Sequence, residues 1–321
     1  MYDIKEMVRI AKLYYELGLT QQEIAERENI SRPTVSRILD AAVKAGIVKF
    51  TVQYPLQSVT DVEEELKTLF QLKKVFVAPV FVEESQYIYS DVGKALSEYL
   101  HDICRDDDII GVSWGNTLTH VAANLKQSKR KGVKVVQLNG GVSKTSFSTG
   151  AMTILEQFSK AFAAQSYMLS VPTIVDSAEI ASSILQDSGV REVISLGRKA
   201  NIAVFGIGKT SYQSVLYTAG YFKENDYEEL LAKGAVGDIC SRFFTIDGEI
   251  CDPELNKRTI GLQLEDLHHK EHSIAMACGV EKASAILGAI QGRYINTLFT
   301  DEQTAREIIR VYHNLRTLEE R

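Results

Sequence analysis

The sequence predicts a small all-α head followed by a large α/β unit. Two observations support this: helix-spaced apolar residues fill 4–45, and from residue 73 onward short apolar runs alternate with helical segments. With 321 residues, 45% hydrophobic and 24% charged, the composition is that of a globular protein with a sizeable core. We expect the head at 1–54, a linker at 55–60, the α/β unit at 61–315 and a solvated tail at 316–321.

The first two helices of the head are marked by residues that end or begin helices. Apolar spacing predicts a helix over 4–17, and Gly18 ends it. Thr20, with Glu23 three residues later, forms a capping-box pattern at the start of a second helix, 21–27.

A tight turn and a third helix follow. Asn29, in the turn 28–30, suits a left-handed conformation, and Ser31 caps a helix that runs to about Ala45. Alternating residues over 47–54 predict a short strand, which would make the head winged. A helix, a three-residue turn and a second helix form the helix-turn-helix arrangement.

The outer face of this arrangement suits DNA. Inward positions are apolar, which leaves Arg and hydroxyl side chains outside, and these are the groups that donate to phosphates and base edges in the major groove. The alternative is a small helical bundle with a polar face. The predicted DNA-binding residues are Gln22, Ser31, Arg32, Pro33, Thr34, Ser36 and Arg37.

The remainder reads as a parallel sheet with both faces covered. A helix is expected at 60–72, directly after the linker. The apolar runs predicted as strands are 75–80, 109–114, 133–138, 167–171, 202–207, 243–246, 274–278 and 295–299. The predicted helices between and after them are 87–103, 117–126, 151–163, 178–185, 227–233, 282–290 and 301–315.

Small and polar residues gather where these strands end, which is where such sheets bind ligands. In 111–117 a strand runs into a Gly/Ser/Thr turn and a helix, so that free backbone N–H groups suit an anion; an ordinary tight turn is the alternative. Asp238 follows a glycine turn and is suited to accept from sugar hydroxyls. Lys282 stands at the start of a predicted helix, where the helix dipole disfavours a positive charge. Either a bound anion or exposure of the lysine to solvent explains its position.

Five segments together resemble the SorC family of bacterial sugar-responsive transcriptional regulators, over nearly the whole chain. They are the recognition segment 31–37 (SRPTVSR), 111–117, 234–238, 279–282 and 296–304 (NTLFTDEQT). The resemblance implies a DNA-binding head and a Rossmann-like effector domain similar to sugar-phosphate isomerases and deaminases. It also implies a phosphorylated sugar as effector, and a homodimer or homotetramer.

Within the family, Lys144 looks like the lysine of deoxyribonucleoside-operon regulators, which implies deoxyribose 5-phosphate as effector, held as a Schiff base. A desolvated lysine is nucleophilic toward an open-chain aldehyde; a surface lysine in a polar loop is the alternative. Asn116 departs from the basic residue expected in many members, which puts more weight on backbone N–H groups and Lys282. The candidate effector-binding residues are Ser113, Gly115, Asn116, Thr117, Asn139, Gly140, Gly141, Lys144, Asp238 and Lys282.

The resulting functional prediction is a repressor that binds near-palindromic operator DNA and is released by the sugar phosphate. The alternative is an active sugar-phosphate isomerase, deaminase or aldolase with a DNA-binding head. Such an enzyme needs an acid/base pair, and Asp238 has no clear partner in the sequence, so we expect no catalytic residues and no cofactor.

Several other classes are disfavoured. There is no apolar stretch of about 18 residues and no signal-peptide pattern, so we expect a cytoplasmic protein without a membrane span. The four cysteines lie far apart without Cys-x-x-Cys, which argues against zinc. Residues 268–272 (HHKEH) fit a zinc-peptidase pattern, but the apolar strand at 274–278 begins too soon for one continuous helix.

Overall fold

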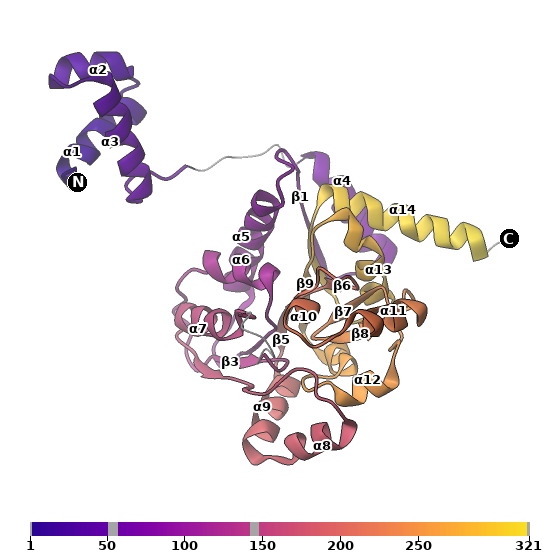
Figure 1. Ribbon diagram of the computed structural model, residues 1–321. Coiled ribbons are helices and arrows are strands. Elements are labelled where there is room, and N and C mark those ends of the chain that lie inside the picture. Colours follow the sequence, from indigo (N-terminus) through magenta and orange to yellow (C-terminus); the bar gives the residue numbers. More distant parts are fainter. Residues whose placement is uncertain (1, 51–56, 142–147, 320–321) are drawn as a thin grey trace. The chain divides into compact units, whose positions relative to one another are not determined.

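The computed structural model describes residues 2–50, 57–141 and 148–319 (Figure 1). The chain divides into two compact units, Met1–Pro55 and Leu56–Arg321. We call them the head and the α/β unit.

The head consists of three helices that begin and end where the sequence predicts. Helix α1 (Ile4–Ala11) continues as a π-helical segment, η1 (Lys12–Glu16), and Gly18 follows with a φ of +70°. Helix α2 (Gln21–Glu28) opens with the Thr20–Glu23 capping box. These features confirm the predicted first two helices.

The turn and the third helix are confirmed as well. Asn29 has a φ of 53°, and Ser31 accepts the N–H of Thr34 at the start of α3 (Arg32–Lys44). The three helices share one apolar core, formed by Met7, Ile10, Ala11, Leu13, Ile24, Ala25, Val35, Ile38, Leu39 and Ala42.

The predicted wing is wrong for residues 47–50, which form no strand, and 51–54 lie outside the described residues. The N–H groups of Ile47 and Val48 return to the carbonyl of Ala42, and both side chains pack against the helical core. The chain therefore turns at the end of α3, because these apolar side chains are used in the core of the head.

The α/β unit is built on a seven-stranded parallel sheet in the order β1-β10-β9-β5-β2-β3-β4. Apart from the added edge strand β1, this is the doubly wound Rossmann order 3-2-1-4-5-6. The strands are β1 (Lys74–Ala78), β2 (Ile109–Val112), β3 (Lys134–Gln137), β4 (Gln165–Tyr167), β5 (Ile202–Gly206), β9 (His272–Met276) and β10 (Thr297–Asp301).

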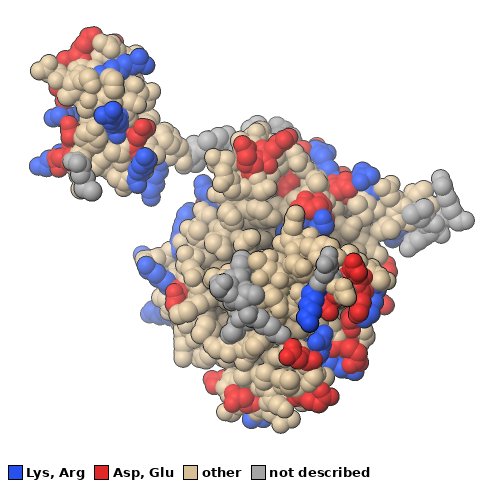
Figure 2. All heavy atoms as spheres, in the orientation of Figure 1, with Lys and Arg blue, Asp and Glu red and all other residues tan. Residues whose placement is uncertain are grey.

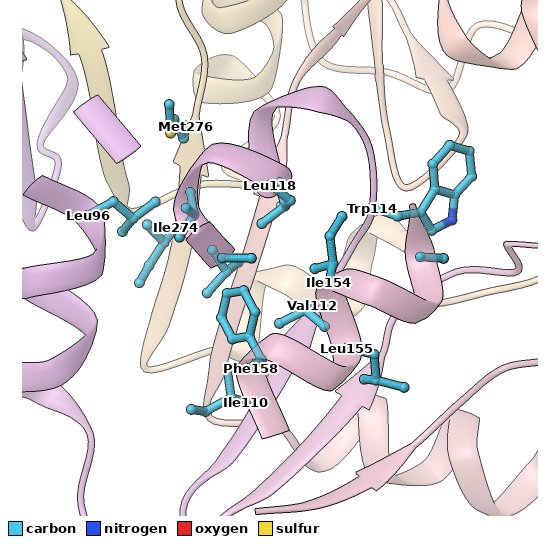
Figure 3. Packing of buried hydrophobic residues seen from close by; sticks show 14 of the residues in the cluster. Leu96, Ile110, Val112, Trp114, Leu118, Ile154, Leu155, Phe158, Ile274 and Met276 are labelled. Carbon is cyan, nitrogen blue, oxygen red and sulfur yellow. The ribbon is translucent and has the colours of Figure 1, made fainter. Parts of the chain in front are cut away.

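Helices cover both faces of this sheet. In β5, Ile202 and Val204 join one apolar cluster, whereas Ala203 and Phe205 join the other, as the alternation of a strand requires. The first cluster includes the labelled side chains of Figure 3 from α5, α6 and α7. Its helices are α5 (Ser85–Ile103), α6 (Asn116–Asn124) and α7 (Ala151–Ala161); the second cluster uses α4 (Gln57–Phe70), α13 (Ala283–Gln291) and α14 (Glu302–Glu319).

One predicted strand belongs elsewhere. The run 243–246 is not part of the parallel sheet. Its first two residues belong to β8 (Arg242–Phe244), which pairs antiparallel with β7 (Gly237–Ile239), next to β6 (Gly208–Lys209), and 245–246 form no strand. This three-stranded sheet is inserted between β5 and β9 together with α10 (Val215–Thr218) and α11 (Glu224–Ala232). Its strands are too short to show a periodicity of their own.

Other boundaries also differ from the predictions. Helix α4 begins at Gln57, inside the predicted linker 55–60, and α14 continues through most of the predicted tail. The strand predicted at 167–171 ends at Tyr167. Helix α8 (Ala178–Gln186) is followed by an unpredicted helix α9 (Ser188–Lys199), whose two glycines weaken the helical signal. Also unpredicted are α12 (Pro253–Arg258), η2 (Leu264–His269) and η3 (Val280–Lys282).

Candidate functional site

The α/β unit has a cavity of about 300 Å³ at the topological switch point of its sheet. From β2 the chain runs outward through β3 to β4, then returns to β5 beside β2 and proceeds the other way. Loops that follow the adjacent ends of β2 and β5 both line this cavity. The lining comprises 113–117, Asn139, 206–209, 211, 213–216, 238, 240–241, 281–282 and Tyr89 of α5.

The loop after β2 presents a helix N-terminus to the cavity. Gly115 has a φ of +120° and a ψ of 173°, a conformation open to glycine, and no atom lies within 4 Å of where a Cβ would be. Helix α6 begins at the next residue, and its first-turn N–H groups have no partner within the helix. The side chains of Asn116 and Thr117 border the same space, so the loop offers several donors to an anion.

Asn139 is held by two hydroxyl groups beside this loop. Its Oδ1 accepts from Ser113 Oγ at 3.1 Å, and its Nδ2 donates to Ser241 Oγ at 3.2 Å. The residue is only 1% exposed. Because one amide proton and one lone pair remain, Asn139 can still bind a polar group in the cavity.

Asp238 lies on β7, opposite Gly208 of β6. A side chain at Gly208 would collide with the Asp238 carboxylate, so the glycine makes room for it. Burial raises the pKa of Asp238 to about 6, although the Ser241 N–H at 3.1 Å and the nearby Lys282 both act to lower it. The cavity thus contains a carboxyl group whose pKa lies well above its usual range.

The loop after β9 places a positively charged side chain, that of Lys282, at the edge of the cavity. Lys282 Nζ lies 3.3 Å from the hydroxyl of Tyr89 and 5.6 Å from the centre of its ring. That hydroxyl donates to the carbonyl oxygen of Cys278 at 3.1 Å. Lys282 is therefore held against α5 while it borders the same cavity as the N-terminus of α6.

Seven of the ten predicted effector residues line this one cavity: Ser113, Gly115, Asn116, Thr117, Asn139, Asp238 and Lys282. Gly140 and Gly141 do not line it, and close packing accounts for glycine at both positions. A Cβ at Gly140 would lie 2.6 Å from the carbonyl oxygens of Val171 and Pro172, so this glycine permits close packing of backbones. A Cβ at Gly141 would lie 2.7 Å from side-chain atoms of Ala151 and Gln137, so this glycine leaves room for those two side chains. Lys144 lies outside the described residues.

Several residues that line the cavity are not among the predicted effector-binding residues. Trp114 forms part of the wall, and its ring N–H donates to the carbonyl of Gly140 at 2.8 Å. Cys240 and Ser241 form the two-residue turn between β7 and β8 with φ values of 52° and 68°. Hairpin turns of this kind normally carry Asn or Gly, so Cys-Ser gave no signal. The other lining residues outside that prediction are Tyr89, 206–209, Ser211, 213–216 and Glu281.

Most of the predicted DNA-binding residues of the head are exposed. Gln22, Arg32 and Arg37 are exposed, whereas Thr34 and Ser36 are half-buried. Gln22 and Arg32 border the same surface groove at the start of α2 and α3. In Figure 2, basic and acidic side chains are interspersed on the visible face of the head, in keeping with eight basic and seven acidic residues in 1–55.

The structure also tests the predictions about a zinc site and a membrane span. The HHKEH segment does not lie on one helix, because η2 ends at His269 and His272 already belongs to β9. Within the described part of the chain, no group of three or more His, Cys, Asp or Glu residues could hold a metal ion. None of the described helices combines the length and apolarity needed to cross a membrane.

Comparison with known proteins agrees with this division. Residues 54–310 match the family described as "Putative sugar-binding domain", and residues 18–49 match "Winged helix-turn-helix DNA-binding". The fold, the head and the cavity together define a DNA-binding transcriptional regulator with a sugar-binding domain.

The chain belongs to the SorC family of such regulators. It is 40% identical over 304 residues to the deoxyribonucleoside regulator of Bacillus subtilis (strain 168), covering 94% of this chain and 96% of the relative. It is 32% identical over 312 residues to the sorbitol operon regulator of Klebsiella pneumoniae, covering 96% and 98%. The crystal structure of that full-length regulator, SorC, superposes with a TM-score of 0.77 at 31% identity, covering 95% and 98%. All are named as regulators, and the enzyme alternative finds no support among them.

Proposed function

We propose that this regulator is a repressor that leaves its operator when deoxyribose 5-phosphate fills the cavity of the α/β unit. The observation that carries the proposal is the pairing of the α6 N-terminus with Lys282 around one cavity of about 300 Å³. Such an arrangement suits a phosphate group, and the cavity lies where doubly wound sheets bind ligands. The name of the Bacillus subtilis relative, a deoxyribonucleoside regulator, favours a deoxyribose derivative over other sugar phosphates.

In this proposal each end of the sugar phosphate has its own partners. The phosphate accepts from backbone N–H groups at 115–117 and from Lys282, as charge-assisted hydrogen bonds. Asn139 and Asp238 bind the hydroxyl groups of the sugar. Lys144 is assigned to the aldehyde end, where an imine with the open-chain sugar would form.

On the DNA side, a homodimer or homotetramer binds a near-palindromic operator through α2 and α3 of its heads. The effector must bind one arrangement of the oligomer more tightly than another, because a ligand with equal affinity for both shifts nothing. The arrangement it favours is the one with low operator affinity, which gives repression without effector and release with it.

Calorimetric titration of the full chain tests the effector. Deoxyribose 5-phosphate should bind at least about 100-fold more tightly than deoxyribose, because several charge-assisted hydrogen bonds are lost with the phosphate. Lys282→Ala should weaken the phosphorylated ligand by about tenfold or more, whereas the exposed Lys199→Ala should not. Equal affinity for the two sugars would refute the phosphate site.

Borohydride trapping tests the covalent part separately. Reduction of the complex followed by mass spectrometry should find the sugar on Lys144, since an imine becomes a stable amine. Tight binding without an adduct, unaltered by Lys144→Ala, would remove Lys144 from the site and leave the phosphate assignment standing.

A further inference from the structure

The loop that carries Lys282 is fastened to the first turn of α14, which does not line the cavity. The N–H of Gly279 points to two acceptors: Asp301 Oδ2 at 3.1 Å and Thr304 Oγ1 at 2.7 Å. Gly279 itself has a φ of +109°. The loop then turns back on itself, because the N–H of Lys282 donates to the carbonyl of Gly279 at 2.9 Å.

Asp301 and Thr304 form a closed hydrogen-bond unit. Thr304 Oγ1 donates to Asp301 Oδ2 at 2.6 Å, and the Thr304 N–H donates to Asp301 Oδ1 at 2.9 Å. Asp301 is 2% exposed and Thr304 is fully buried. The N-cap bond at the start of α14 uses only Oδ1, so Oδ2 can accept from both the Thr304 hydroxyl and the Gly279 N–H of the loop.

A third bond joins the same two segments. Thr300 Oγ1, on β10, donates at 2.7 Å to the carbonyl of Ala277, the first residue after β9. Behind these contacts α14 is firmly packed: Ala305 and Ile308 are fully buried in one apolar cluster with Val62 and Leu66 of α4. The loop is therefore tied to a rigid part of the α/β unit.

We infer that Asp301 and Thr304 are positioning residues of the effector site, which fix the loop 279–282 so that Lys282 faces the cavity. The inference rests on the proposed phosphate site. A lysine side chain has large rotamer freedom and binds phosphate as a point charge, so its contribution depends on where its backbone is held. Tyr89 holds the far end of the Lys282 side chain, and the Asp301–Thr304 pair holds the near end of its loop.

The test is a double-mutant cycle on deoxyribose 5-phosphate binding to the full chain. Thr304→Val removes the hydroxyl, and should weaken the ligand by about tenfold, whereas Thr304→Ser, which keeps it, should stay within about twofold of the wild type. Thr173→Val is the matched control, since the structure gives the buried Thr173 hydroxyl no hydrogen-bond partner among the described residues. It should leave the affinity unchanged.

The cycle separates positioning from general damage. In a Lys282→Ala background Thr304→Val should have no further effect, because the pair acts through that lysine. An unchanged affinity in Thr304→Val, or a loss that adds fully to that of Lys282→Ala, would overturn the inference. If Thr304→Val does not fold, Asp301→Asn is used instead, because it can keep the Oδ1 bond to the Thr304 N–H and replaces Oδ2 by a donor. Failure of the wild-type chain to bind deoxyribose 5-phosphate would refute the proposed function rather than the positioning role.

Discussion

The head and the α/β unit build their candidate sites in opposite ways. In the head, the predicted DNA-binding residues fall within residues 22–37, on two successive helices. In the α/β unit, the cavity collects residues from Tyr89 to Lys282, carried by helix α5 and by five separate stretches of chain within 113–117, 139, 206–216, 238–241 and 281–282. The surface of the head can be predicted once the helix boundaries are known, because its residues are close in sequence. The cavity can be predicted only when the order of the strands in the sheet is known, because its residues are far apart in sequence. The two sites should therefore respond to mutation independently.

The largest effect that tests this independence is on DNA. Arg32→Ala and Arg37→Ala should each weaken operator binding by about 1–3 kcal/mol, because a bidentate base contact or a phosphate contact is lost. A mobility-shift titration at fixed salt measures this, with the exposed Lys12→Ala as a charge-matched control of small effect. Deoxyribose 5-phosphate affinity in the absence of DNA should stay unchanged. A change there would show that the two sites are coupled more directly than their separate construction suggests.

The next effect is a pH dependence confined to the α/β unit. The pKa of Asp238 is raised to about 6 by burial, so the folded state holds this proton more tightly than the unfolded state. The stabilisation is fully present below the unfolded pKa and is lost as pH rises through about 6. Between pH 5 and 8 the wild type should lose about 1 kcal/mol of unfolding free energy through this group, and Asp238→Asn should not show that loss.

Thermal or urea unfolding at pH 5 and pH 8 measures this difference. The exposed Asp102→Asn serves as the control and should keep the pH dependence of the wild type. A wild-type slope in Asp238→Asn would mean that other groups of the cavity control the titration.

The smallest expected effect tests whether the loss of a helix cap in one unit affects the stability of that unit alone. Thr20→Ala removes the capping box of α2 and should cost about 1 kcal/mol, seen as faster hydrogen exchange of α2 amides in the full chain. Ser177→Ala removes the side-chain cap of α8, and its effect should be confined to the α/β unit. Altered exchange in the head of Ser177→Ala would contradict the separate stability of the two units.

Most of the head follows from its sequence because its signals act within a turn or two. The Thr20 capping box, the left-handed Asn29 and the Ser31 cap each bond to residues three or four positions away. The predicted wing failed because the apolar residues Ile47 and Val48 pack against helices, which a two-residue periodicity does not reveal.

Only part of the cavity could be predicted, because some of its turns have a local sequence signal and others do not. The Gly115 turn shows in sequence, since a strand, a glycine and a helix follow one another directly. The Cys240–Ser241 turn does not, because two side-chain-bearing residues are held with positive φ by their surroundings. Gly140 resembles a ligand-binding glycine in sequence but serves close backbone packing.

The sequence by itself determined the two units, the helix starts of the head and most of the runs that become strands of the parallel sheet, since caps and periodicity depend on near neighbours in the chain. The tertiary structure decided the order of those strands, and with it the place where β2 and β5 meet. It also decided that α14 would hold the loop of Lys282. Periodicity reports which face of a strand is buried, but the neighbour of a strand is fixed by packing between residues far apart in the chain.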